Sequence, residues 1–288
     1  MPAPTPSPPV ARVPVPVDTR APGGTTNAYV AGGLLVDPAA RTDALDGAVG
    51  LDAGGESEGE RVAVDAVAVT HTHPDHVGAV AEYAALTGAP VLARADRVDR
   101  FAEATGVEPD GTFRGGETVG PTAVRAVDTP GHAPDHVAFA VAEGRGDESG
   151  EAGGASVSHA LLCGDLAVDD GSVVVGAPEG DLREYLDSLE RVRDAGYDRL
   201  YPGHGPVIDD PEAVCDRLID HRLDRERAVL AAVEAGAADV DAVVDAAYEK
   251  DLTGVTDLAR ATVVAHLEKL LAEGRIDERL AARLDREE

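Results

Sequence analysis

Residues 70–78 read THTHPDHVG and place three histidines and one aspartate within six residues. The whole chain contains only nine histidines, so this stretch holds a third of them. The preceding residues 62–69 (VAVDAVAV) form a short apolar run, which is typical of a buried strand. The sequence therefore predicts a set of ligand-type side chains directly after the carboxyl end of a strand.

The spacing within this stretch suits metal binding. His71 and His73 are two residues apart, so both side chains point the same way on an extended backbone. Pro74 interrupts the extended run, and Asp75 and His76 follow it. One short loop can thus direct two ligands to one ion and two to a second ion. Imidazole and carboxylate suit zinc, and they also suit iron or manganese. A loop with coincidental histidines is the alternative, which this spacing disfavours.

Four side chains on one loop cannot complete two coordination shells, so other segments should supply ligands. A glycine lets the backbone turn sharply and approach an ion closely. Three candidates each follow a predicted strand at a turn that contains glycine: His132 in TPGH, Asp165 in CGD and His204 in PGHG. Each motif is a weak signal alone, and the shared context makes the set strong.

The first half of the chain predicts an extended arm followed by strands and a helix. Residues 1–24 are rich in proline, which favours an arm or an edge strand. Residues 25–40 predict a hairpin around Gly32 and Gly33. The pattern after Pro74 is helical and ends at Gly88.

The second half combines strands with a helical tail. Residues 144–158 are polar and rich in glycine and serine, which predicts a flexible surface insertion. Residues 181–195 form an amphipathic helix pattern with Asp181 as its N-cap. A long helix follows from residue 211 to about 235, and residues 237–288 hold two further helical stretches.

The motifs THTHPDH, TPGH, CGD and PGHGPV, in that order, resemble those of the metallo-β-lactamase superfamily over about residues 25–208. The resemblance implies an α/β fold, an αββα sandwich of two packed sheets with helices outside. It also implies the ligand sets. The first metal would be bound by His71, His73 and His132, and the second by Asp75, His76 and His204. Asp165 would bridge the two metals.

The tail narrows the resemblance. The segments DHRLDRE (220–226) and VVAHLEKLLAEGRI (263–276) are similar to a branch that carries a small helical, winged-helix-like C-terminal domain. That branch includes the lactamase-β-like endoribonuclease of animal mitochondria. The predicted organisation begins with an arm (residues 1–24) and a catalytic domain (25–210). A connecting helix (211–236) and a winged-helix-like domain (237–288) follow.

A dinuclear site of this kind activates water for attack on a carbonyl or phosphoryl group. Asp75 would orient or deprotonate that water. Asp135 and His136 are expected to orient ligands without binding metal themselves. No Ser-His-Asp or Cys-His pattern offers a convincing nucleophile. The two cysteines, Cys163 and Cys215, have no CxxC spacing and are expected to be buried.

The charge of the chain is strongly acidic. It has 54 acidic and 25 basic residues, a net charge of −29, and only two lysines. This composition resembles that of halophilic archaeal proteins, and it predicts a fold that loosens in low salt, where charge repulsion is not screened. Unchanged circular dichroism between molar and millimolar KCl would contradict this expectation.

The expected reaction is hydrolysis of an ester, thioester or lactone of a small molecule. A single-strand endoribonuclease is the alternative. A polyanion needs a basic groove, whereas residues 237–288 hold 13 acidic and 7 basic side chains. A local basic patch could still bind RNA, and it consists of Arg217, Arg222, Arg225 and Arg227. A persulfide dioxygenase and a non-enzymatic winged-helix binding protein are weaker alternatives.

The N-terminal residues have no basic stretch followed by an apolar core, and no apolar run approaches 18 residues. A secretory signal and a membrane span are therefore not expected, and the predicted location is the cytoplasm. Duplex DNA is not an expected partner because the tail is acidic. The sequence does not decide whether the chain forms a homodimer.

Overall fold

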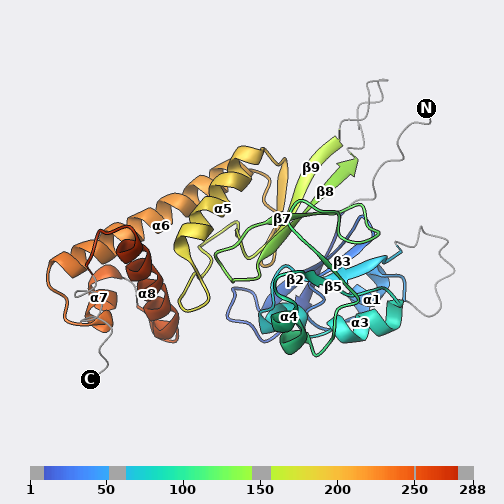
Figure 1. Cartoon of the computed structure of the whole chain (residues 1–288), viewed down its shortest axis with the longest axis horizontal. Helices are drawn as coiled ribbons and strands as arrows, with labels where there is room; N and C mark the ends of the chain where they lie inside the picture. The colour runs from blue at the N-terminus through green and yellow to red at the C-terminus, as the bar shows by residue number, and fades with distance from the viewer. Residues whose placement is uncertain (1–9, 52–62, 145–156, 250, 278–288) are drawn as a thin grey trace. The chain divides into compact units, whose positions relative to one another are not determined.

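The computed structural model describes residues 10–51, 63–144, 157–249 and 251–277 of the 288-residue chain (Figure 1). They fall into two compact units that each combine separate stretches of sequence. The first unit is formed from 1–128, 135–170 and 196–211, and the second from 129–134, 171–195 and 212–288.

The first unit begins with a four-stranded sheet in the order β1-β2-β3-β4. The strands are β1 (Ala11–Pro16), β2 (Thr25–Ala31), β3 (Leu34–Val36) and β4 (Ala66–Ala68). β1 is an edge strand and pairs antiparallel with β2, whereas β3 and β4 are parallel. The described part of the predicted arm therefore contains an edge strand, while residues 1–9 lie outside the described residues.

The β2–β3 hairpin confirms the turn expected at two glycines. Gly32 has φ 56° and Gly33 has φ 87°, a region that side chains with a Cβ rarely adopt. Of the strand expected over residues 62–69, residue 62 lies outside the described residues, and within 63–69 the strand covers Ala66–Ala68. Its partner β3 offers three residues to pair with, so the ladder is limited to three.

A second four-stranded sheet has the order β10-β9-β8-β7. Its strands are β7 (Arg125–Asp128), β8 (Val137–Gly144), β9 (Val157–Gly164) and β10 (Arg199–Pro202). Residues 145–156 connect β8 and β9 and lie outside the described residues, so the flexible insertion stays a prediction. A small parallel sheet joins β5 (Leu92–Arg94) and β6 (Gly111–Phe113).

The two four-stranded sheets share one hydrophobic core, which confirms the expected sandwich. Tyr29 and Leu34 of the first sheet pack in the same buried cluster as Phe139, Leu162 and Tyr201 of the second. Burial of each large apolar side chain stabilises the fold by about 1.5–3 kcal/mol. The sandwich therefore provides a rigid base for the loops at the strand ends.

Helices and apolar residues of the first sheet form another cluster in the first unit. Leu45, Tyr83 and Phe101 are buried there with Val30 and Val67 of the sheet. The helices of this unit are α1 (Asp43–Ala48), α2 (Pro74–Val77), α3 (Val80–Thr87) and α4 (Val98–Thr105). Helix α3 ends at Gly88, as predicted.

The second unit is helical. Its helices are α5 (Leu182–Ala195), α6 (Pro211–Glu234), α7 (Val240–Ala247) and α8 (Thr256–Ala272). Asp181 Oδ1 accepts hydrogen bonds from the backbone N–H groups of Arg183 and Glu184 at 2.8 and 3.2 Å, so it caps α5 as expected. Val229, Val243, Val263 and Leu270 form the core of α6, α7 and α8.

The described part of the tail is helical. Residues 237–249 and 251–277 hold α7 and α8 and no strand, so the winged-helix-like module and its boundaries stay predictions. Cys163 and Cys215 are free and buried, as expected. Over the described ranges, no helix has the combined length and hydropathy of a membrane span.

Candidate metal centre

The predicted ligands of the THTHPDH motif lie where β4 ends and α2 begins. His71 is 1% exposed and His76 is fully buried, while His73 and Asp75 are half-buried. Asp165 follows the last residue of β9, and His204 follows β10. Both residues are buried. The sandwich thus brings three separated segments of the first unit to one place.

Two groups of side chains in this unit have ligand atoms that all lie within 4.8 Å of one another. They are His71, His76 and Asp165, and then Asp75, His76 and His204. His76 Nε2 lies 3.7 Å from Asp165 Oδ1, and His204 Nε2 lies 3.4 Å from Asp165 Oδ2 and 3.6 Å from Asp75 Oδ2. Ligand atoms about 2.0–2.2 Å from a tetrahedral ion lie roughly 3.4 Å apart, so these separations fit a coordination shell.

The ring of His76 is oriented as a metal-binding imidazole would be. Its Nδ1 lies 2.9 Å from Asp37 Oδ2, and Asp37 is itself 1% exposed. Its Nε2 is buried and has no hydrogen-bond partner among the described residues. A carboxylate on Nδ1 holds the proton there and leaves the lone pair on Nε2, which is the form that binds a metal. The residues present therefore fit a divalent metal.

The electrostatics of the cluster agree with this fit. Burial lowers the pKa of His76, but the charges of Asp37, Asp165 and Asp75 outweigh it and raise the pKa to about 9. Burial also lowers the pKa of His204, and its contacts with Asp165 and the Thr25 carbonyl raise it overall. Such concentrated negative charge stabilises a cation at this point, and a bound metal would compete with the protons of these rings.

Asp165 is held by its neighbours. Its backbone N–H donates to His136 Nε2 at 3.1 Å, and His136 is fully buried. Gly164 has φ 50°, and a Cβ there would lie 2.8 Å from His136 Nε2. The CGD motif therefore needs its glycine, and His136 lies against a predicted ligand, where an orienting residue is expected.

Asp135 has a different partner. Its Oδ1 accepts from Arg100 Nε at 3.2 Å, and the same nitrogen lies 2.9 Å from Thr72 Oγ1. Asp135 is thus linked through Arg100 to the loop that carries His71 and His73. Its role in orienting a ligand stays a prediction.

The loop of His204 is fastened to the first sheet. His204 Nδ1 lies 2.8 Å from the Thr25 carbonyl oxygen. Asn27 Nδ2 donates to the carbonyls of Pro202 and Gly205, both at 2.9 Å. These contacts fix the turn and direct the Nε2 edge of His204 to the two aspartates.

Gly203 is required by close packing. A Cβ at this position would lie 2.4 Å from Asp165 Oδ1 and 2.9 Å from His76 Cε1. Any larger residue would push apart the segments that bring the ligands together.

His132 belongs to the second unit, within residues 129–134. Its Nδ1 lies 2.8 Å from the Val174 carbonyl oxygen. Gly131 has φ 123°, and a Cβ there would lie 2.2 Å from the backbone nitrogen of Tyr185. The TPGH glycine therefore allows a tight approach of this turn to α5.

Sequence reasoning missed Asp37. This residue has φ 52°, which is rare without glycine, and accepts from Thr70 N at 2.7 Å and Thr70 Oγ1 at 2.8 Å as well as facing His76. It follows β3 as Asp165 follows β9, and that shared pattern of a strand followed by an acid could have revealed it. Thr19, which donates to Asp75 Oδ2 at 2.5 Å, has no comparable signal.

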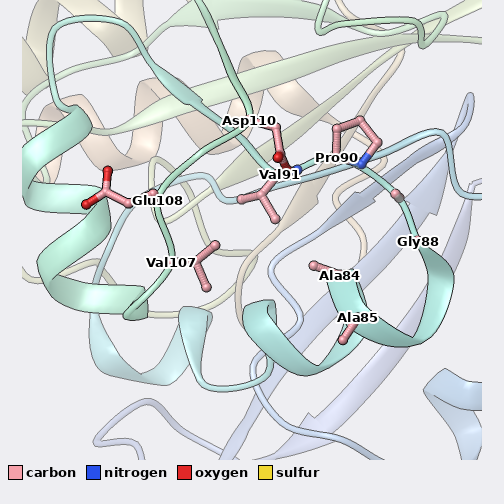
Figure 2. A pocket seen from close by; sticks show the side chains of 9 residues that line it. Ala84, Ala85, Gly88, Pro90, Val91, Val107, Glu108 and Asp110 are labelled. Carbon is pink, nitrogen blue, oxygen red and sulfur yellow. Dashed lines mark hydrogen bonds between the residues drawn. The ribbon is translucent and has the colours of Figure 1, made fainter.

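A pocket of about 400 Å³ lies elsewhere in the first unit (Figure 2). Its lining includes Ala84, Pro90, Val91 and Val107, with Glu108 and Asp110 as its acidic residues. None of the lining residues is a predicted ligand, so this pocket is not part of the metal centre.

Comparison with known proteins identifies the family of this chain. Residues 21–204 match the family model of the metallo-beta-lactamase superfamily. A beta-lactamase-like protein 2 homolog of Drosophila melanogaster is 30% identical over 231 residues, which are 75% of this chain and 72% of that protein. An atrochrysone carboxyl ACP thioesterase of Aspergillus fumigatus is 31% identical over 176 residues, 59% of this chain and 48% of that protein.

Solved structures show the same fold. A metallo-beta-lactamase family protein of Thermus thermophilus superposes with a TM-score of 0.67 at 26% identity, over 93% of this chain and 95% of that one. A beta-lactamase domain protein of Burkholderia ambifaria gives a TM-score of 0.65 at 19% identity, over 92% and 87%. The sandwich, the clustered histidines and aspartates and these matches have one explanation: the chain belongs to the metallo-beta-lactamase superfamily and is a hydrolase of that fold.

Proposed function

We propose that this hydrolase cleaves a thioester, ester or lactone bond of a small molecule at a site for two divalent metals, zinc in the first place and iron or manganese as alternatives. The observation that carries the proposal is the convergence of His76, Asp75, Asp165 and His204, whose ligand atoms are separated by 3.4–4.0 Å. Separations of this size suit a shared coordination shell.

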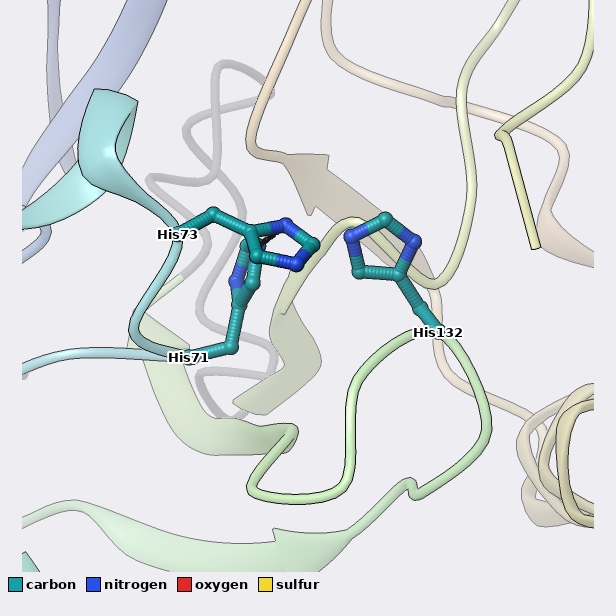
Figure 3. Close-up of side chains that lie close together, drawn as sticks. All are labelled: His71, His73 and His132. Atoms are coloured by element: carbon teal, nitrogen blue, oxygen red, sulfur yellow. Dashed lines mark hydrogen bonds between the residues drawn. The ribbon is translucent and has the colours of Figure 1, made fainter. Parts of the chain in front are cut away.

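Seven side chains would hold the metals. By the motif order described above, His71, His73 and His132, which Figure 3 labels, would bind the first ion. Asp75, His76 and His204 would bind the second ion, and Asp165 would bridge the two. His132 supports this assignment through its Nδ1 contact with the Val174 carbonyl, because a proton on Nδ1 places the lone pair on Nε2.

Divalent metals at such a site supply the Lewis acidity that makes water nucleophilic at neutral pH and polarises the scissile carbonyl. The chain's own residues do the remaining work. Asp75 orients the attacking water and can take its proton on a carboxylate oxygen. Asp37 keeps the proton of His76 on Nδ1, and His136 holds the Asp165 backbone.

The thioester is the favoured substrate class. A relative of 31% identity is named an ACP thioesterase, and its matched region includes about half of that protein. The net charge of −29 also favours a compact substrate over a polyanion.

The four arginines that could have bound RNA contact other groups of the second unit, and Arg217 donates to the Gly171 carbonyl. Arg222 is 3% exposed and donates to the Val173 carbonyl. Arg225 lies 3.6 Å from the centre of the Tyr248 ring, and Arg227 pairs with Asp224. These contacts support the small-molecule proposal over single-stranded RNA.

The test is a metal analysis joined to a substrate panel in molar KCl. Purified protein should contain close to two divalent ions per chain, and it should cleave acyl thioesters or lactones faster than single-stranded RNA or nitrocefin. Chelator treatment should abolish turnover, and added zinc should restore it. Cleavage of RNA alone would favour the endoribonuclease alternative, and fewer than two ions would contradict the dinuclear site.

A further inference from the structure

We propose that the loop between β1 and β2 (residues 17–24) orients the ligands of the second metal, and that Thr19 is the positioning residue for Asp75. This inference rests on the proposed function, because it assigns a role within the same metal centre. It concerns a segment that carries no ligand itself.

The Thr19 hydroxyl is fixed on both sides. Its Oγ1 lies 2.5 Å from Asp75 Oδ2, and it accepts a hydrogen bond from the Ala21 backbone N–H at 3.1 Å. An ionised carboxylate can only accept, so Thr19 is the donor in the contact with Asp75. The Ala21 N–H occupies a lone pair of Oγ1 and thereby favours a hydroxyl hydrogen that faces the carboxylate.

The loop that carries Thr19 is closed by its own backbone. Val17 N donates to the Gly24 carbonyl at 3.2 Å, and Gly24 N donates to the Ala21 carbonyl at 3.3 Å. The flanking residues Pro16 and Thr25 are paired in the antiparallel β1–β2 ladder. Thr19 is therefore presented from a short loop whose two ends are fixed in the sheet.

The same connection holds a second ligand. Thr25, the first residue of β2, accepts from His204 Nδ1 at 2.8 Å through its backbone carbonyl. Two of the three residues proposed to bind only the second metal, Asp75 and His204, are thus oriented by one continuous stretch of nine residues, 17–25. The third, His76, is held by Asp37 after β3.

Loss of the Thr19 hydroxyl should weaken the second metal without removing a ligand. Partners that orient a metal ligand typically contribute about 10- to 100-fold in metal affinity. Thr19→Val keeps the branched shape and removes the donor, so it should lower the affinity for the second ion by about that factor. Thr19→Ser keeps the hydroxyl and should stay within about 3-fold of the wild type.

The experiment is a stepwise titration of metal-free protein with Zn²⁺ against a chromophoric chelator, repeated with Co²⁺ to follow each site by its absorption bands. Thr112→Val is the matched control, because Thr112 is an exposed threonine of β6. The unfolding temperature of each metal-free variant separates loss of metal from loss of fold, and Thr19→Ala serves if the valine variant unfolds.

A weakened second ion in Thr19→Val, with wild-type behaviour in Thr19→Ser and Thr112→Val, supports the inference. Two ions bound to Thr19→Val or to Thr19→Ala with wild-type affinity overturn the role of Thr19 and leave the dinuclear site intact. A wild-type protein that binds fewer than two ions overturns both the inference and the proposed function.

Discussion

Two buried histidines, one in each unit, show how neighbours decide what an imidazole does. His76 is fully buried in the first unit and His266 is 1% exposed in the second. His76 faces Asp37, Asp75 and Asp165, and its pKa is raised to about 9 although burial lowers it. The pKa of His266 is lowered to about 3, by burial first and then by Arg222, Arg225 and Lys269.

An unpartnered ring nitrogen is therefore not enough to mark a metal site. His76 Nε2 lacks a hydrogen-bond partner among the described residues, and so do both ring nitrogens of His266. The surroundings differ in sign: carboxylates stabilise a cation beside His76, whereas arginine and lysine side chains repel a cation beside His266. The first is a candidate ligand, and the second is a neutral packing residue of α8.

The largest expected effect comes from removing the carboxylate that would bridge both metals. Asp165→Ala should lose both ions or most of the activity, with a decrease in kcat/KM of more than about 100-fold, beyond the usual range for residues that only orient ligands. Inductively coupled plasma analysis and a thioester assay would measure this. Asp99→Ala, which removes an exposed carboxylate of α4, is the control. Full metal occupancy in Asp165→Ala would refute the bridging role.

A smaller change tests the negative charge behind His76. Asp37→Asn keeps a residue that tolerates a positive φ but removes the carboxylate that faces Nδ1. We expect about 10- to 100-fold weaker binding of the second metal, because the ring would lose its orienting partner. Chelator competition would measure the affinity, with the exposed Asp65→Asn as control. Wild-type affinity for the metal would mean that the Asp37 carboxylate is not needed to orient His76.

His266 predicts that the folding stability depends on pH. The folded-state pKa of His266 lies below the usual 6.5, so folded His266 stays neutral while the unfolded chain gains a proton as pH falls. The associated stability is complete above pH 6.5 and decreases by about 1.4 kcal/mol per pH unit toward pH 3. Between pH 6.5 and 5, wild type should therefore lose about 2 kcal/mol relative to His266→Leu.

Urea unfolding in molar KCl would measure this difference. His159→Gln, at an exposed histidine of β9, provides the control and should lose stability in parallel with wild type. Parallel pH profiles of wild type and His266→Leu would mean that His266 is not held neutral by its surroundings.

The smallest expected effect concerns a third buried histidine. His136 Nε2 accepts from the Asp165 backbone N–H, and glutamine can offer an acceptor at a similar position. His136→Leu should be less stable than His136→Gln by about 1 kcal/mol, the usual net contribution of one hydrogen bond. Thermal unfolding of the two variants would measure it. Equal stability would leave His136 without the orienting role.

Local sequence patterns predicted much of this molecule correctly. Glycine pairs marked the β2–β3 turn, Asp181 marked the start of α5, and Gly88 marked the end of α3. These features depend on backbone conformation and hydrogen bonds within a few residues, which a short stretch of sequence encodes directly. The same holds for the order of strand, turn and ligand that indicated the superfamily.

The partners of the ligands depend on contacts between distant residues. Asp37 precedes His76 by 39 positions, and Thr19 precedes Asp75 by 56. No short pattern connects such residues, because they meet only when the sheets bury their shared core. The grouping of residues 129–134 with the helical unit is likewise absent from the order of the chain.

By itself the sequence determined which side chains could bind metal and that each would stand at the end of a strand, because residue chemistry and strand periodicity are local properties. Only the tertiary structure decided which of two buried imidazoles sits among carboxylates and which among arginines. The physical reason is that a pKa depends on burial and on the charges of neighbouring groups, and folding determines both.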